Sequence, residues 1–194
     1  MSNIYSEVLA AVERGEAATL KTEFTGAEGI IAKGLKKSIA PYAPQTDVRG
    51  RRFADVTLTE SDGCFTVGEP FSPPERLIIL GAGHIALPVC DFAAKSGFEV
   101  YVCDDRPAFA NTARFPLAQE VLCDSFENCI SRLRLTGYDY VVVITRGHTH
   151  DADCLRAIFK GTQPAYLGLI GSRRRVRGLF DMLLEEGCPK EYMD

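Results

Sequence analysis

The chain has 194 residues, of which 46% are hydrophobic and 25% charged, and this length suits one well-packed core plus a small additional domain. Its net charge of −4 argues against a nucleic-acid-binding protein, which normally carries a strongly basic face. No stretch approaches the roughly 20 apolar residues of a membrane-spanning helix, and the first residues lack a signal-peptide pattern. We therefore expect a cytoplasmic protein with no membrane span and no nucleic-acid partner.

The cysteines are seven in number, widely scattered, and contain no Cys-x-x-Cys pair. This spacing predicts neither a disulfide framework nor a zinc site. Most of them are expected to be small buried hydrophobic residues.

Residues 1–70 are predicted to form a small α+β domain. Apolar residues at helical spacing predict a helix over 4–12, and Asp62-Gly63 is a strong hairpin signal. Short extended segments are predicted at 18–22, 29–32, 53–58 and 64–67. The adjacent prolines Pro73 and Pro74 mark a stiff boundary, since proline favours an extended chain.

Residues 75–194 alternate regularly between strand and helix patterns. Strands are predicted at 77–80, 99–103, 120–122, 140–144 and 165–170, helices at 85–95, 126–135, 152–160 and 173–186, and a short helical or irregular crossover at 108–113. This alternation predicts a Rossmann-like α/β domain, a parallel sheet with helices on both faces. The strand at 140–144 is the most apolar, and we expect it to be central.

The first of these strands is followed by a glycine turn, Gly81-Ala82-Gly83-His84. In a Gly-x-Gly-x-x-Ala turn the first glycine permits the bend, the second lets a phosphate approach the backbone, and the small third residue lets helix pack on strand. The start of the following helix suits an anion. His84 is unexpected here, because a dehydrogenase has no general need of an imidazole in this turn.

The ends of the other strands lie on the same edge of a parallel sheet, where ligands bind. Asp104 follows the second strand at a distance that suits a ribose hydroxyl, although a surface pair with Arg106 is the alternative, and Arg106 could instead meet a 2′-phosphate. Gly147, His148 and His150 follow the fourth strand. The two imidazoles could bind a metal, move protons or hold an oxyanion, and their spacing leaves this open.

The same loop and the last strand end offer further candidates. Asp151 is read as the N-cap of the helix over 152–160. Gly171, Ser172 and Arg173 open the last helix and predict a second anion-binding turn, with a solvated charged helix face as the alternative. All three histidines of the chain therefore follow strand ends on one predicted edge.

These motifs resemble the XdhC/CoxI family, accessory factors for xanthine dehydrogenase and related molybdenum hydroxylases. The segments that carry the resemblance are 73–84, 104–111, 145–151 and 166–174, in this order. The resemblance implies a Rossmann-like domain that binds and protects the molybdenum cofactor, of molybdopterin type, and helps to deliver its sulfurated form. It also implies a homodimer, a hydroxylase apoenzyme as partner, and a cysteine desulfurase as a second partner.

Two departures from the family pattern limit what can be transferred. Residues 1–70 contain neither the Gly-Ser-x-Pro turn nor the Gly-Gly-Cys-x-Glu segment, so no cofactor-handling role passes to Cys64. The Gly-Leu-Asp-Ile-Gly-Ala-type segment that usually follows the last helix does not occur in these 194 residues. We expect a divergent member, with an atypical N-terminal region and a shortened C-terminus, whose sulfuration or delivery step differs or involves another chain.

Three functional hypotheses follow. The first is a cofactor chaperone that need not catalyse any reaction, with a rim formed by Gly81, Gly83, His84, Asp104, Arg106, Gly147, His148, His150, Gly171, Ser172 and Arg173. In that case, His84, His148 and His150 are also the candidates for any catalytic role. The second is an NAD(P)-dependent oxidoreductase, which would need a substrate pocket that about 70 short-stranded residues must supply. The third is a non-catalytic module that senses NAD(P).

Overall fold

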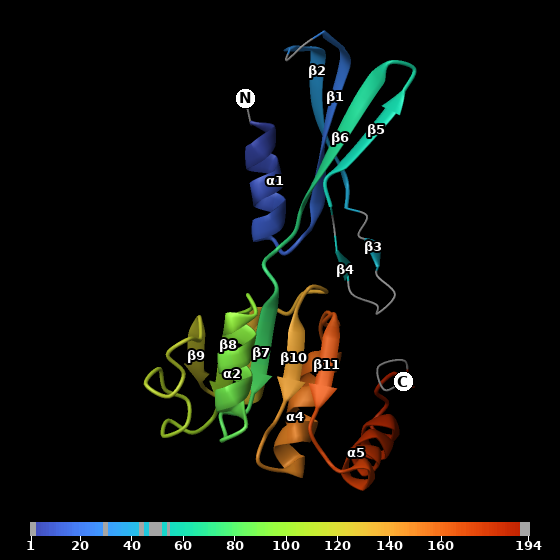
Figure 1. Cartoon of the computed structure of the whole chain (residues 1–194). Coiled ribbons are helices and arrows are strands. Elements are labelled where there is room, and N and C mark those ends of the chain that lie inside the picture. Colours follow the sequence, from blue (N-terminus) through green and yellow to red (C-terminus); the bar gives the residue numbers. More distant parts are fainter. Residues whose placement is uncertain (1–2, 29–30, 43–44, 47–51, 54, 191–194) are drawn as a thin grey trace. The chain divides into compact units, whose positions relative to one another are not determined.

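A computed structural model describes residues 3–28, 31–42, 45–46, 52–53 and 55–190 of the chain. The chain divides into two compact units, Met1–Pro73 and Pro74–Asp194 (Figure 1). Among the described residues, no helix is long and apolar enough to cross a membrane.

The first unit is a helix with an antiparallel sheet in the order β2-β1-β6-β5. Its elements are α1 (Ile4–Glu13), β1 (Ala18–Glu28), β2 (Ile31–Pro41), β5 (Thr57–Ser61) and β6 (Cys64–Phe71), with a separate pair β3 (Gln45–Thr46) and β4 (Arg52–Phe53). The side chain of Asn3 caps α1 by accepting a hydrogen bond from the Tyr5 N–H. Val8 and Leu20 are among the side chains that the helix and β1 bury.

The predicted hairpin at Asp62-Gly63 is confirmed, because both residues have left-handed φ angles of 51° and 72° between β5 and β6. The single strand expected at 53–58 is wrong: β4 ends at Phe53 and β5 begins at Thr57. The ladder of β5 with β6 starts at the pair of Thr57 and Gly68, and residue 54 of the expected strand lies outside the described residues. Of the strand expected at 29–32, residues 29–30 lie outside the described residues.

The second unit confirms the Rossmann-like parallel sheet, in the order β11-β10-β7-β8-β9. Its strands are β7 (Arg76–Leu80), β8 (Glu99–Asp104), β9 (Glu120–Cys123), β10 (Tyr140–Val143) and β11 (Tyr166–Leu169). The central strand is β7, not the one over 140–144 as expected. A continuous apolar run indicates a strand that is covered on both faces. Because β7 and β10 both have such a run, this pattern does not distinguish which of them is central.

Helices cover both faces of this sheet. They are α2 (Ala86–Lys95), α3 (Phe126–Leu133), α4 (His148–Phe159) and α5 (Arg173–Glu185). Successive residues of β7 point to opposite faces: Leu77 and Ile79 pack with α2, whereas Ile78 and Leu80 join the core under α3, α4 and α5. The sheet is thus buried on both sides.

Two helix boundaries differ from the sequence expectation. α3 ends at Leu133 rather than at residue 135, because Arg134 takes a left-handed φ of 47°. α4 begins at His148, since its N-cap is Gly147 with an extended backbone. Asp151 is therefore inside the first turn of α4, and its predicted capping role is wrong. Residues 108–113 contain turns and no helix.

The cysteines are free, and four of them lie in the core as expected: Cys90, Cys103, Cys129 and Cys154. The neighbouring Cys129 thiol and burial raise the pKa of Cys103. Cys123 is exposed, and Cys64 and Cys188 are half-buried.

Candidate functional site

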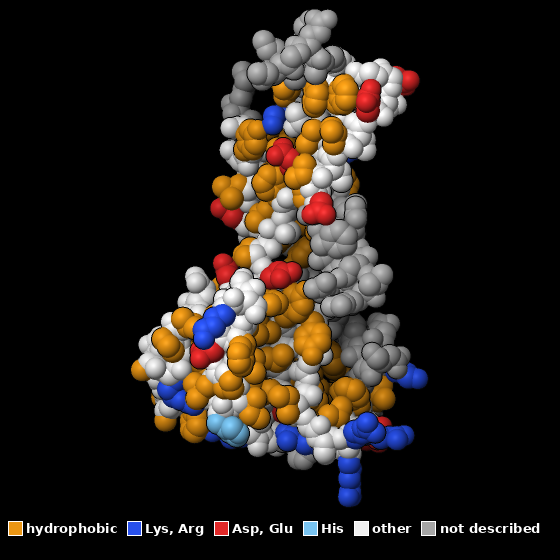
Figure 2. Space-filling model, in the orientation of Figure 1, with side chains coloured by type: hydrophobic (Ala, Val, Ile, Leu, Met, Phe, Trp, Pro, Cys, Tyr) orange, Lys and Arg blue, Asp and Glu red, His pale blue; other side chains and the backbone are white. Residues whose placement is uncertain are grey.

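The predicted site residues lie at the ends of four parallel strands. We call this region the carboxyl edge and define it as residues 81–86, 104–106, 145–151 and 170–175. Strand order reverses between β7 and β10, and ligands of open α/β sheets bind beyond the strand ends at such a reversal. Figure 2 shows basic side chains gathered along the lower border of the molecule, where the strand arrows of Figure 1 point.

The two glycines of the turn after β7 have different structural roles. Gly81 has a φ of 112°, and a Cβ there would lie 2.5 Å from the carbonyl oxygen of Ile144. Only glycine lets the ends of β7 and β10 approach so closely. Gly83 has open space, because nothing lies within 4 Å of an added Cβ. The first glycine serves the fold, and the second leaves room in front of the turn.

Asp104 braces this turn from the end of β8. Its carboxylate is 1% exposed and accepts hydrogen bonds from the Ala82 N–H at 2.8 Å and from Arg106 Nε at 2.7 Å. Burial alone would raise the pKa of Asp104, but the hydrogen bonds from Arg106 and Ala82 outweigh it and lower the pKa. The alternative pairing of Asp104 with Arg106 is therefore present, while the ribose contact stays a prediction.

Arg114, which the sequence analysis did not select, holds the same turn from the other side. Its guanidinium donates to the carbonyl oxygens of Ala82 at 2.8 Å and Phe109 at 2.9 Å. The guanidinium of Arg106 lies 3.8 Å from the Phe109 ring centroid. No sequence signal marks Arg114, because it lies in the irregular segment before β9 and follows no strand end.

A second ion pair links the ends of β8 and β10. Arg146 makes a bidentate contact with Asp105, at 2.7 and 2.9 Å. The hydrogen bond from Arg146, together with the positive charge of its guanidinium, lowers the pKa of Asp105 to about 2.

The three histidines occupy different positions on the carboxyl edge. His84 lies in the glycine turn and is exposed. His150 is half-buried, with its ring edge-on to Phe126 at 5.9 Å between centroids. His148 is the first residue of α4, and its side chain lies outside what the structure describes. Among the described residues, no group of three or more His, Cys, Asp and Glu side chains is arranged to hold a metal ion.

Asp151 ties the starts of α4 and α5 together. Its carboxylate is 1% exposed, accepts a hydrogen bond from the Thr145 hydroxyl and forms an ion pair with Arg175. Sequence reasoning missed this link because the two partners are 24 residues apart. The contact fixes the position of α5 relative to the strand ends.

The helix starts on this edge differ in how they are capped. Ser172 caps α5 by accepting a hydrogen bond from the Arg175 N–H, and Gly171 precedes it. Neither α2 nor α4 has a side-chain cap, and α4 carries Asp151 in its first turn. The start of α2 has neither a capping side chain nor an acidic residue. It is therefore the helix end on this edge best suited to an external anion.

The family comparison matches the part of the chain that builds this edge. The sequence model of the XdhC Rossmann domain matches residues 77–194, which is more than half of the chain. The chain belongs to the XdhC family. All eleven predicted site residues lie within the matched range.

Two curated relatives are similar to this XdhC-family chain. It is 35% identical over 140 residues to a probable xanthine dehydrogenase subunit of Bacillus subtilis (strain 168), covering 72% of this chain and 42% of the relative. It is 31% identical over 120 residues to the "Uncharacterized protein YqeB" of Escherichia coli (strain K12), covering 61% of this chain and 21% of the relative. The chain thus spans less than half the length of the curated relatives that it matches.

A solved structure supports the fold. The crystal structure of a xanthine dehydrogenase from Bacillus halodurans superposes with a TM-score of 0.63 at 23% identity, covering 91% of this chain and 52% of that one. At this identity the likeness concerns the fold alone. The superposed part of this XdhC-family chain extends beyond its Rossmann domain into the N-terminal unit.

Proposed function

We propose that this XdhC-family protein is an accessory factor of a xanthine dehydrogenase-like molybdenum hydroxylase. It binds a phosphate-bearing cofactor of molybdopterin type at the carboxyl edge and aids its sulfuration or its insertion into the apoenzyme. Two observations support the proposal. The chain belongs to the XdhC family and has a xanthine dehydrogenase-related relative, and the turn after β7 is open. The protein acts as a carrier and need not catalyse a reaction.

The uncapped start of α2 is the observation that carries the cofactor part of this proposal. In the described residues, neither Gly83 nor His84 donates its backbone N–H to a protein acceptor. Open space lies at Gly83, so an anion can reach both groups and the positive end of the helix. These features fit the terminal phosphate of the cofactor. Asp104 and Arg114 hold the turn in this conformation before the ligand arrives.

The histidines add polar side chains to the carboxyl edge. In the proposal, His84, His148 and His150 face the metal-bearing end of the bound cofactor, and Arg106, Gly147, Gly171, Ser172 and Arg173 complete the rim. The molybdenum centre supplies the redox chemistry of the hydroxylase after delivery. The protein's own side chains bind the cofactor, orient it and limit its contact with water.

The partners in this proposal are a hydroxylase apoenzyme, a cysteine desulfurase and a second copy of the chain. They are the partners that the family resemblance implies. Two exposed apolar side chains, Ile85 just before α2 at 40% exposed and Phe92 on α2 at 72%, offer contacts for a protein partner. Which of the three partners uses these contacts can be measured by mixing the chain with each and recording the loss of hydrogen exchange.

Native mass spectrometry of the purified chain tests the cofactor proposal. The protein is offered molybdenum cofactor and, separately, NAD and NADP, and we expect retention of the molybdenum cofactor. Gly83→Ala places a methyl group in the open space in front of the turn, so we expect at least tenfold weaker binding with unchanged melting. Gly161→Ala, at the end of α4 away from the carboxyl edge, is the matched control.

Two outcomes would contradict the proposal. Retention of only the nicotinamide nucleotides would favour a sensor, and consumption of NAD(P)H with a small substrate would favour an oxidoreductase. In addition, the double variant His148→Ala with His150→Ala should weaken cofactor binding and leave the melting temperature nearly unchanged. An equal loss of binding and stability would show that these histidines are structural.

A further inference from the structure

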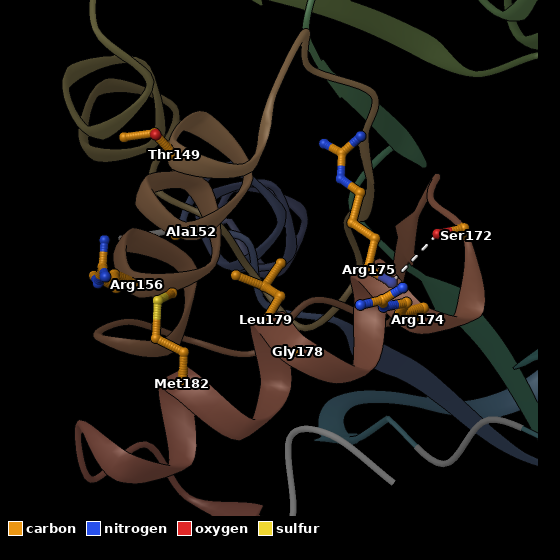
Figure 3. Close-up of a pocket in the computed structure, with 9 residues that line it drawn as sticks. All are labelled: Thr149, Ala152, Arg156, Ser172, Arg174, Arg175, Gly178, Leu179 and Met182. Atoms are coloured by element: carbon orange, nitrogen blue, oxygen red, sulfur yellow. Dashed lines mark hydrogen bonds between the residues drawn. The ribbon is translucent and has the colours of Figure 1, made fainter.

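A cavity of about 540 Å3 lies between α4 and α5 and includes part of the carboxyl edge, at Thr149, Ser172, Arg174 and Arg175 (Figure 3). The residues lining it are Thr149, Ala152, Arg156, Ser172, Arg174, Arg175, Gly178, Leu179 and Met182. Only Ser172 belongs to the predicted cofactor rim. Gly171 and Arg173 line a separate hollow of about 560 Å3 beside α5. The volume falls in the range of roughly 300–1,000 Å3 typical of small-molecule sites.

One wall of the cavity is apolar. In Figure 3 the side chains of Leu179 and Met182 project from α5 toward α4, and Ala152 of α4 also lines the cavity. A thioether makes favourable contacts with aromatic rings, and guanidinium groups stack on aromatic faces. This wall therefore suits a flat aromatic body.

The lining also contains three arginines and two hydroxyl side chains, and no acidic side chain is part of it. Two of its three arginines have partners: Arg156 makes a bidentate contact with Glu186, and Arg175 pairs with Asp151. Arg174 forms no ion pair with a described residue. The Nε atom of Arg175 is buried and has no hydrogen-bond partner among the described residues.

We propose that this cavity binds an aromatic heterocycle that carries a phosphate group, of the size of a nucleoside monophosphate. The phosphate lies at Arg174 and the hydroxyls of Thr149 and Ser172, and the ring lies on Leu179 and Met182. Phosphate at this position also offsets the repulsion among the arginines that open α5, a helix with no acidic residue in its first turn. The site is additional to the proposed cofactor site at the start of α2.

Calorimetric titration of the full chain tests this. The probes are AMP, GMP, CMP and UMP, with the four nucleosides and inorganic phosphate as partial ligands. We expect at least one nucleotide to bind with one site per chain, and both partial ligands to bind at least tenfold more weakly. If none of the four nucleotides binds, the proposal is wrong.

Three variants locate the site. Arg174→Ala should weaken nucleotide binding by about tenfold, whereas Arg177→Ala, the same charge change on α5 outside the cavity lining, should not. Gly178→Leu fills the cavity from a helix position where an added Cβ meets nothing within 4 Å, so it should abolish binding and keep the fold. Equal losses in the two arginine variants, or full binding in Gly178→Leu, would overturn the assignment.

Measurement of molybdenum-cofactor binding in the same variants separates the two proposals. Gly178→Leu should bind the cofactor as the unchanged protein does, because it lies outside the glycine turn. Loss of both ligands in Gly178→Leu would show that the cavity is part of the cofactor site and would refute a separate nucleotide site. Loss of cofactor binding in Gly83→Ala alone leaves the cavity proposal standing.

Discussion

The replacement Asp104→Asn tests whether the carboxylate at the end of β8 supports the fold. The side chain is 1% exposed and accepts hydrogen bonds from the Ala82 N–H and from three donors of Arg106: its backbone N–H at 3.1 Å, Nε at 2.7 Å and a terminal nitrogen at 2.9 Å. An amide keeps one acceptor oxygen but turns two N–H groups toward donors. It also removes the nearer of the two carboxylates at the Arg106 guanidinium and leaves Asp105 at 4.0 Å.

The expected cost follows from these contacts. Hydrogen bonds to charged groups contribute about 1.5–3 kcal/mol each, and breaking a buried pair costs about 3–5 kcal/mol. The Arg106 side chain is 30% exposed and can turn toward water, so we take a value below that range, about 2 kcal/mol. For a unit of this size, this lowers the melting temperature by roughly 5–10 °C.

Urea unfolding followed by far-UV circular dichroism measures this loss, since the chain has no tryptophan. Asp105→Asn is the matched control. Asp105 is the next residue in the chain, but its side chain is 33% exposed and pairs with Arg146 at the surface. A loss below about 0.5 kcal/mol in Asp104→Asn, the range of ordinary surface substitutions, would refute the bracing role. It would then favour a ligand contact for Asp104.

Three other substitutions test the turn, the surface ion pair and the last helix. Gly81→Ala should destabilise the protein by about 2–3 kcal/mol because of its positive φ and the contact with a backbone carbonyl, whereas Gly83→Ala should change the unfolding free energy by less than about 0.5 kcal/mol; denaturant titration of both variants decides. The Asp105–Arg146 pair contributes stability above the unfolded pKa of about 3.9, and this contribution is lost as the pH falls through the folded value of about 2. Unfolding of the Asp105→Asn variant should therefore show a weaker pH dependence between about pH 4 and pH 2 than that of the unchanged protein, and an identical dependence would contradict the pairing. Gly178→Ala should stabilise α5 by about 1 kcal/mol, which thermal melting can detect, and a lower melting temperature would show that the position tolerates no side chain.

The fold class of the second unit could be predicted from local patterns. Short apolar runs alternating with helical periodicity are sufficient to indicate a parallel sheet, and Gly81 marks a turn with a backbone conformation that few other residues adopt. In the first unit, Asp62-Gly63 marks the hairpin in the same way. Element ends were less predictable. α4 begins at His148 because Gly147 takes an extended conformation, and the sequence alone did not distinguish this from a cap at Asp151.

The sequence by itself also determined which residues follow the strand ends, and the XdhC motifs it contains determined the family. Tertiary structure alone decided what those residues contact. Arg114 reaches Ala82 across 32 residues, and Arg175 reaches Asp151 across 24. Such pairs have no sequence signature, because their separation depends on how the sheet and its helices pack. The same packing leaves the start of α2 uncapped and opens the cavity between α4 and α5.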